Sequence, residues 1–129
     1  MAVNPTFGEY LRNLRKAAKL DQRELARRVD ARLLGAGHAR GFDVTYLSKI
    51  ENDRVEPPSA EAVGALAEEL GADQYYLMVL AGKTPPGVGR TLRESPGAQR
   101  FYRSSQESVL TEEQWAQLEH RLRELKGER

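Results

Sequence analysis

The feature that most constrains this chain is a series of helix start signals, each a Thr, Asp or Ser placed before apolar residues at helical spacing. Thr6 with Glu9, and Asp21 with Glu24, fit the capping box, in which two side chains three residues apart satisfy free amides of the first turn. No alternation of apolar and polar residues between turn signals is long enough to require a strand. The pattern predicts an all-α protein. Further caps of this kind are Asp43, Ser59, Asp73, and Thr111 with Gln114.

Stop signals divide residues 1–82 into five expected helices. The first covers about 7–18, the second begins near Gln22, and the third follows Asp43. The fourth runs to about Leu70, because Gly71 can adopt the left-handed conformation that ends a helix. The fifth is "QYYLMVLAG", which ends before Pro85 and Pro86. We therefore expect a five-helix domain over residues 1–82.

Residues 83–129 have a different texture and form an expected helical C-terminal extension. A Gly-, Ser- and Arg-rich stretch predicts short helices that need a partner surface, and the last helix, "EEQWAQLEHRLRELK", carries apolar residues that step by three, four and three. This seam is narrow, and a helix of about 15 residues is marginal alone in water. It must therefore dock either back on its own domain or on a second copy of the chain, and we expect the second copy, which makes it a dimerisation element. The seam consists of Trp115, Leu118, Leu122 and Leu125.

Charge is clustered along the chain although the formal net charge is only +1. Residues 1–58 carry 11 basic and 8 acidic side chains, residues 59–82 carry no basic and 4 acidic ones, and residues 83–129 carry 9 basic and 7 acidic ones. The N-terminal excess is a modest footprint of the kind that nucleic-acid-binding proteins show. By itself it supports DNA binding only weakly.

Composition excludes several classes of function. The chain has no cysteine, so it holds no disulfide and no thiolate zinc site, and its two histidines lie far apart in sequence. A "GKT" triplet at Gly82 lacks the first glycine and the preceding strand of a phosphate-binding loop. We expect no metal, no cofactor and no enzymatic activity. No signal peptide and no membrane-length apolar run is present, so we expect a soluble, cytoplasmic protein that does not contact membranes.

Two quoted stretches carry a resemblance to a known family. "LRNLRKAAKLDQRELARRV", followed by "VTYLSKIENDRVEPPSAEAVGALAEELGAD", closely resembles the helix-turn-helix family of the lambda repressor and Cro type, also called the xenobiotic-response-element type. The resemblance covers about residues 7–82 and includes the strong signature "YLSKIEN". It implies a lambda-repressor-like fold in which "TYLSKIENDR" is the recognition helix and the start of its exit loop.

The resemblance also implies roles for particular residues. Gln22 and Asn52 match positions that hold DNA phosphates, and Arg15 and Glu51 match a structural ion pair between the first helix and the recognition helix. To the phosphate contacts we add the nearby basic residues Arg23, Arg40 and Arg54. The positions that read or flank bases are Val44, Thr45, Tyr46 and Lys49. None of these four is Asn, Gln or Arg, so we expect little bidentate readout and a larger share of specificity from DNA shape.

The chain departs from the family between the second and third helices. Where a four-residue turn is usual, it inserts about eleven residues, "ARLLGAGHARG". We expect the second helix to run on through Leu34, with Leu33 and Leu34 covering an edge of the core. His38 and Arg40 either reach DNA backbone beside the recognition helix or belong to a solvated loop.

Taken together, these observations predict a sequence-specific DNA-binding transcriptional regulator. We expect a repressor that occupies a two-fold-related operator on double-stranded DNA as a homodimer. One alternative is the DNA-binding antitoxin of a toxin pair, with a protein partner bound to the C-terminal region. Another is a helix-turn-helix adaptor for protein partners, which would lack the steep salt dependence that phosphate contacts give to DNA binding.

Overall fold

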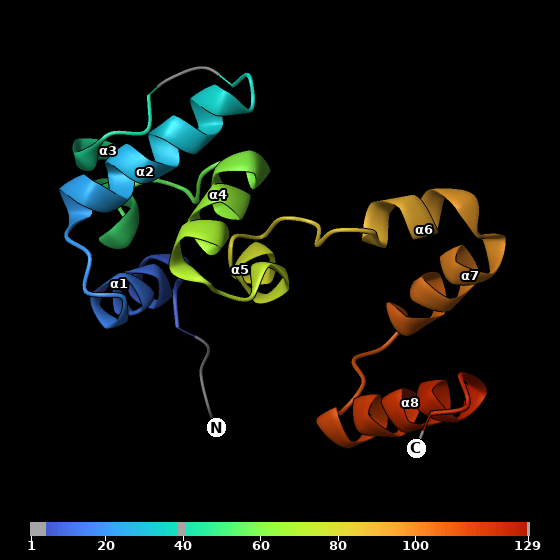
Figure 1. Ribbon diagram of the computed structural model, residues 1–129. Coiled ribbons are helices and arrows are strands. Elements are labelled where there is room, and N and C mark those ends of the chain that lie inside the picture. Colours follow the sequence, from blue (N-terminus) through green and yellow to red (C-terminus); the bar gives the residue numbers. More distant parts are fainter. Residues whose placement is uncertain (1–4, 39–40, 129) are drawn as a thin grey trace. The chain divides into compact units, whose positions relative to one another are not determined.

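The computed structural model describes residues 5–38 and 41–128, and within these ranges it contains eight helices and no strand. The all-α class is therefore confirmed for the described residues. The chain forms two compact units, Met1–Pro86 and Gly87–Arg129. The helices are α1 (Phe7–Ala17), α2 (Gln22–Gly35), α3 (Val44–Glu51), α4 (Ala60–Leu70) and α5 (Gln74–Leu80) in the first unit, and α6 (Val88–Glu94), α7 (Pro96–Ser105) and α8 (Glu112–Leu125) in the second (Figure 1).

Side-chain caps begin the helices of the first unit as the sequence predicts. The Thr6 hydroxyl accepts a hydrogen bond from the Glu9 amide, and the Asp21 and Asp43 carboxylates accept from amides in the first turns of α2 and α3. Ser59 and Asp73 cap α4 and α5 in the same way. These bonds satisfy amides that have no partner inside the helix, so each start is fixed by its own local sequence.

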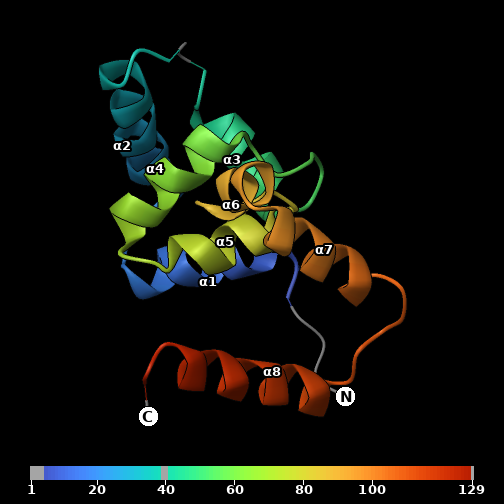
Figure 2. The same ribbon diagram turned by 90° about the vertical axis from the view of Figure 1, so that its right-hand side faces the viewer.

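The core of the first unit lies where α2 packs against α3 and α4, α1 against α3, and α5 against α4. Figure 2 shows α5 next to both α4 and α1, and the rings of Tyr10 and Tyr76 meet edge to face there, 5.0 Å apart. Burial of this apolar surface supplies most of the driving force for folding. The largest fully buried apolar side chains are Leu11, Leu25, Val29, Leu47, Ile50, Val63, Leu66 and Leu77.

The start of α1 is joined to the exit of α3. Asp53 follows α3 with a left-handed φ of 56°, and its carboxylate accepts hydrogen bonds from the Thr6 hydroxyl, at 2.7 Å, and the Gly8 amide, at 3.2 Å. The two backbones approach so closely that a Cβ on Gly8 would lie 2.4 Å from the Ile50 carbonyl oxygen. Glycine is therefore required at position 8 to let α3 pack on α1.

The insertion continues α2 and then returns to the core. The helix runs to Gly35, one residue beyond the predicted end, and Leu33 joins the core cluster. The expectation that Leu34 also covers the core is wrong, because its side chain points outward and is 48% exposed. The Asp30 carboxylate accepts hydrogen bonds from the amides of Gly41 and Phe42, which closes the excursion eleven residues after it leaves the core.

The extension of α2 is anchored on α4 by charge. The Arg32 guanidinium donates hydrogen bonds to the carboxylates of Glu68 and Glu69. Arg28 Nη1 lies 3.9 Å from Glu69 Oε2. The arginines and Glu68 are exposed, whereas the Glu69 side chain is 14% exposed, and together these pairs hold the extension of α2 on α4. The added turn of α2 is thus part of the folded unit.

The second unit has helices without a buried core of their own. In it α6 packs on α7, and no residue of α6, α7 or α8 is buried. The α8 start is a complete capping box, with Thr111 and Gln114 bonded to each other's backbone amides. Large apolar side chains therefore lie at the surface of this unit.

The close approach at Gly8 yields a prediction about stability. Gly8→Ala should destabilise the first unit by about 1–3 kcal/mol or more, because the new methyl group meets backbone oxygens that cannot move aside. Gly35→Ala is the matched control, since a Cβ there meets nothing within 4 Å and alanine is the better helix former. Chemical denaturation of both variants measures the effect, and equal stabilities would contradict it.

Candidate nucleic-acid interface

The helix α3 divides its residues between the core and one outward face. Leu47, Ile50 and Glu51 are buried, whereas the side chains of Thr45 and Lys49 are exposed. The other two residues expected to read bases are only half exposed. Val44 and Tyr46 pack against the core cluster, and the Tyr46 ring meets Phe42 edge to face at 5.4 Å. The face that α3 offers to a partner therefore consists mainly of Thr45 and Lys49, with the rims of the other two beside them.

The N-terminus of α2 lies beside the C-terminal end of α3. Gln22 is the first residue of α2, and its side-chain amide donates a hydrogen bond of 3.0 Å to the Glu51 carboxylate of α3. The free amides of a helix N-terminus and its positive dipole end attract anions. This end of α2, held against α3 by Gln22, is thus a surface on which a phosphate can be bound.

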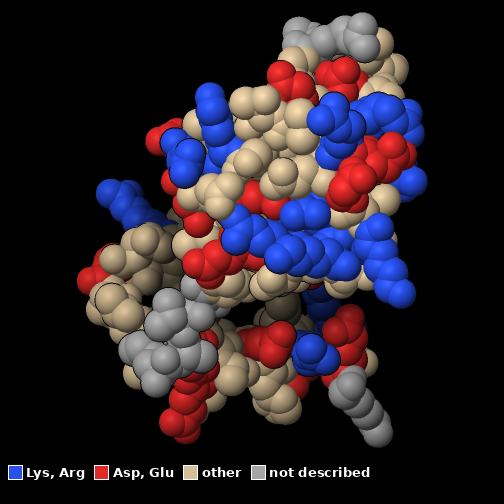
Figure 3. Space-filling view, turned by 90° about the vertical axis from the view of Figure 1, so that its left-hand side faces the viewer, with Lys and Arg blue, Asp and Glu red and all other residues tan. Residues whose placement is uncertain are grey.

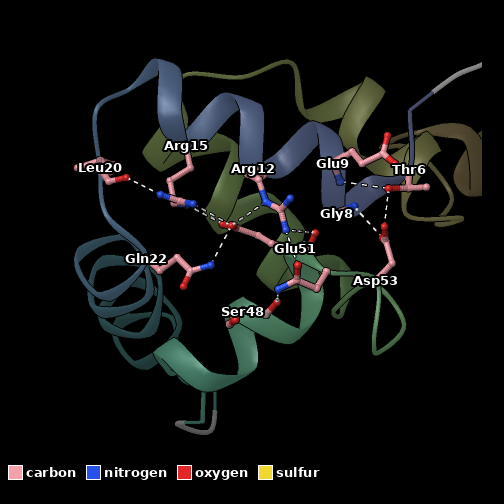
Figure 4. Close-up of polar contacts among 11 residues, drawn as sticks. Thr6, Gly8, Glu9, Arg12, Arg15, Leu20, Gln22, Ser48, Glu51 and Asp53 are labelled. Atoms are coloured by element: carbon pink, nitrogen blue, oxygen red, sulfur yellow. Dashed lines mark hydrogen bonds and ion pairs between the residues drawn. The ribbon is translucent and has the colours of Figure 1, made fainter.

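A buried carboxylate connects these elements. Glu51 is 1% exposed and accepts hydrogen bonds from Arg15 Nε at 2.7 Å, Arg15 Nη2 at 3.0 Å and Gln22 Nε2 at 3.0 Å (Figure 4). Arg15 also donates to the Leu20 carbonyl, so its guanidinium spans α1, the turn after it and α3. The hydrogen bond to Glu51 and the charge of that carboxylate raise the pKa of Arg15 above its ordinary value. The bonds fix α1, α2 and α3 to one another.

Arg12 joins this network, and sequence reasoning did not single it out. Its Nη2 atom donates to the Glu51 carbonyl oxygen at 3.1 Å and to Asn52 Oδ1 at 2.6 Å, while its Nε lies 3.8 Å from the Glu51 carboxylate. Asn52 in turn donates from Nδ2 to the Ser48 carbonyl oxygen at 2.8 Å. The sequence did hold a signal for this residue, because Arg12 lies three residues before Arg15 and therefore on the same side of α1.

Of the other basic residues assigned to phosphates, the structure describes Arg23 and Arg54. Arg54 is exposed just after α3, and Arg23 is exposed on the first turn of α2. Arg40 lies outside the described residues. His38 lines a hollow with Arg32, Glu61 and Gly64, so the structure places it against α4 rather than beside α3. This position does not support the expectation that His38 contacts DNA next to the recognition helix.

Basic side chains gather on the face formed by the first three helices. Figure 3 shows this face, with Lys and Arg side chains in bands and acidic side chains between them. Hydrogen bonds from Arg27 and Arg28 lower the pKa of the Glu24 carboxyl to about 2, so Glu24 stays charged and offsets part of the basic charge on α2. The exposed basic residues of this region include Lys16, Lys19, Arg23, Lys49 and Arg54.

Other kinds of site find no support among residues 5–38 and 41–128. No group of three or more His, Cys, Asp or Glu side chains in these ranges is arranged to hold a metal ion. No helix there has the length and apolar character that crossing a membrane requires. The polar network around Glu51 and the outward face of α3 are thus the main chemical features of the first unit.

The second unit carries an apolar groove between α7 and α8. The groove has a volume of about 480 Å³ and is lined by Phe101 of α7 and by the seam of α8, together with Glu119 and Arg121. All four seam residues are exposed, from 36% at Leu118 to 68% at Leu125. A contiguous apolar surface of this kind marks an interaction site in most proteins that fold in water.

Comparison with known proteins places the first unit in a family. The profile of a family described as a helix-turn-helix domain matches residues 6–75, which is more than half of the chain. The matched segment contains α1 to α4 and the Glu51 network. Neither the curated proteins nor the solved structures gave a significant match.

The Glu51 network yields a prediction about stability. Arg15→Ala or Glu51→Ala should destabilise the first unit by about 3–5 kcal/mol, because each removes the main partner of a charge that has little access to water. The double variant should cost less than the sum of the two. Denaturant unfolding of the parent and the three variants gives the coupling free energy. Single variants as stable as the parent would show that the pair contributes nothing.

Proposed function

Because the chain belongs to the family of helix-turn-helix domains, we propose that it is a sequence-specific DNA-binding transcriptional regulator. In this proposal it acts as a repressor that occupies a two-fold-related operator as a homodimer, in the cytoplasm and without catalysis. The observation that carries the proposal is the placement of two exposed side chains, Thr45 and Lys49, on a helix that Glu51 holds rigidly against the start of α2.

The geometry supports a specific mode of binding. An α-helix fits the major groove of duplex DNA, and a preceding helix that meets the backbone sets its angle. In this mode α3 enters the groove, Lys49 donates to guanine or to a phosphate, and the Thr45 methyl meets thymine methyl groups. Gln22 has one amide hydrogen on Glu51 and a second one left for a phosphate at the start of α2.

We also infer that the first unit is of the lambda repressor and Cro type. The described residues of this unit form five helices, and the "YLSKIEN" signature occupies α3 and the residue after it. The eleven-residue insertion departs from that type, but Asp30 closes it and Phe42 returns to the core, so α3 keeps its place against α2. The insertion therefore does not argue against this assignment.

The first test separates base contacts from phosphate contacts. Lys49→Ala and Thr45→Ala should weaken binding to a selected operator more than to random duplex DNA, by a difference of about 1–3 kcal/mol for a good base contact. Gln22→Ala should weaken both by a similar factor, because phosphate contacts carry no sequence information. Fluorescence titrations with both duplexes measure these ratios. If Lys49→Ala lowered the affinity for every sequence by the same factor, Lys49 would be a phosphate contact and not a base contact.

The homodimer in this proposal rests on the second unit. Reading two half-sites requires two recognition helices about 34 Å apart, and a stable interface buries about 800 Å² on each partner. The exposed seam of α8 and the adjoining Phe101 form an extended apolar surface in the second unit. We therefore place the dimer contact on this surface, and a toxin or other protein bound there would be the alternative.

A matched pair of substitutions tests the dimer contact. Leu122→Glu should weaken dimerisation and operator binding at least tenfold, because it places a charge in the centre of the seam. Leu34→Glu is the control, since Leu34 is 48% exposed and Leu122 is 50% exposed, yet Leu34 lies on α2. Sedimentation equilibrium measures the dimer constants. A chain truncated after Gln106 that still forms a tight dimer would exclude α8 as the dimerisation element.

A further inference from the structure

Two arginines, Arg12 and Arg15, face the single carboxylate of Glu51, so one of the two positive charges is not neutralised by that carboxylate. Arg15 takes both oxygens of Glu51 in a bidentate contact, and its side chain is only 11% exposed. Arg12 approaches one of the same oxygens at 3.8 Å, beyond hydrogen-bond distance, and its side chain is 34% exposed. One buried carboxylate thus faces two guanidinium groups, and the surplus charge lies on the one nearer to the surface.

The Arg12 guanidinium also keeps free hydrogen-bond donors. Its two bonds, to the Glu51 carbonyl and to Asn52 Oδ1, both leave from Nη2. The Nη1 atom makes no hydrogen bond to any described residue, and it carries two N–H groups. Because the Nη2 bonds fix the plane of the group, Nη1 is held in one direction rather than sampling many.

Asn52 is oriented by the same contacts. Its Oδ1 accepts from Arg12, and its Nδ2 donates one hydrogen to the Ser48 carbonyl, so the second hydrogen on Nδ2 has no bond to a described residue. The residue is exposed and directly follows α3. An amide donor and a cation are therefore fixed side by side at the C-terminal end of the candidate recognition helix.

We propose that Arg12 and Asn52 together bind one phosphate of the DNA backbone, with Arg12 as the cationic member. A phosphodiester oxyanion matches this pair, because it accepts hydrogen bonds from a guanidinium and an amide at once. The proposal rests on the proposed function, and it adds Arg12 to the residues that touch DNA. A purely structural role, in which Arg12 only satisfies the last carbonyls of α3, is the competing explanation.

The test measures how DNA binding depends on salt. Duplexes selected by the parent chain from a random pool, and a random duplex of equal length, are titrated between about 0.05 and 0.5 M salt, a range in which phosphate contacts weaken strongly. Arg12→Gln should reduce the slope of log affinity against log salt by about 1, and should weaken binding to both duplexes about tenfold near 0.1 M salt. Glutamine keeps an N–H donor for the Glu51 carbonyl or Asn52, so the fold should be retained, and thermal unfolding checks this.

Control variants separate a phosphate contact from a general loss of charge. Arg32→Gln removes one charge from a side chain of comparable exposure, 43%, that is paired with Glu68 and Glu69 on the α4 side, and should leave the slope unchanged. Arg12→Lys keeps the charge and should restore the parent slope. In the Arg12→Gln background Asn52→Ala should cost less than it does in the parent, because both act on one phosphate.

A second measurement does not depend on the stability of one variant. It uses a series of operator duplexes, each with one uncharged methylphosphonate linkage at a different position. At one of these positions the linkage should change the affinity of the parent and the affinity of the residue-12 variants by different factors. The proposal would be overturned if binding by the parent depended steeply on salt, the slope in Arg12→Gln were unchanged and no linkage position distinguished the parent from the variants. Arg12 would then be a structural residue. Parent binding that is weak and insensitive to salt on every duplex would instead overturn the proposed function itself.

Discussion

The buried carboxylate of Glu51 is the interaction on which the rest of the first unit depends. A charge that is 1% exposed is tolerated only if it is paired and hydrogen-bonded, and here the partners come from α1 and from the start of α2. Only a narrow range of geometries preserves all of these bonds. The apolar core would accept small shifts of α3, but the bonds to Glu51 admit few, so they determine where the outward face of α3 lies.

Much of the fold could be predicted because helix starts are encoded locally. The side chains of Thr6, Asp21 and Asp43 each bond an amide three residues later, so the signal lies within one turn of sequence. The end of α2 was predicted to within one residue despite the insertion, since "GAG" follows at once. The failure at Leu34 has a physical cause, because Leu33 and Leu34 differ by about 100° around the helix and only one of them can face the core.

The polar contacts of the candidate site could not be predicted in the same way. Arg12 meets Asn52 forty residues later, and Asp53 meets Thr6 forty-seven residues earlier. No periodicity links such positions, and only the family resemblance pointed to Arg15 and Glu51. The Asp30 bonds that close the insertion likewise depend on where the chain returns. These contacts become visible only when the helices are packed, although each residue type was suited to its role.

The residues that hold α1, α2 and α3 together also carry the free donors proposed to bind phosphate. Gln22 and Asn52 each donate one amide hydrogen to a bond inside the network, and Arg12 donates both hydrogens of Nη2. The remaining donors are thereby fixed before any phosphate arrives, which lowers the entropy cost of binding. An anion bound by these donors would in turn stabilise the packing of α1, α2 and α3, because it binds only the folded arrangement. Stability and affinity are therefore coupled at this site, so a loss of DNA binding in any variant of the network must be compared with its unfolding before it is assigned to a lost contact.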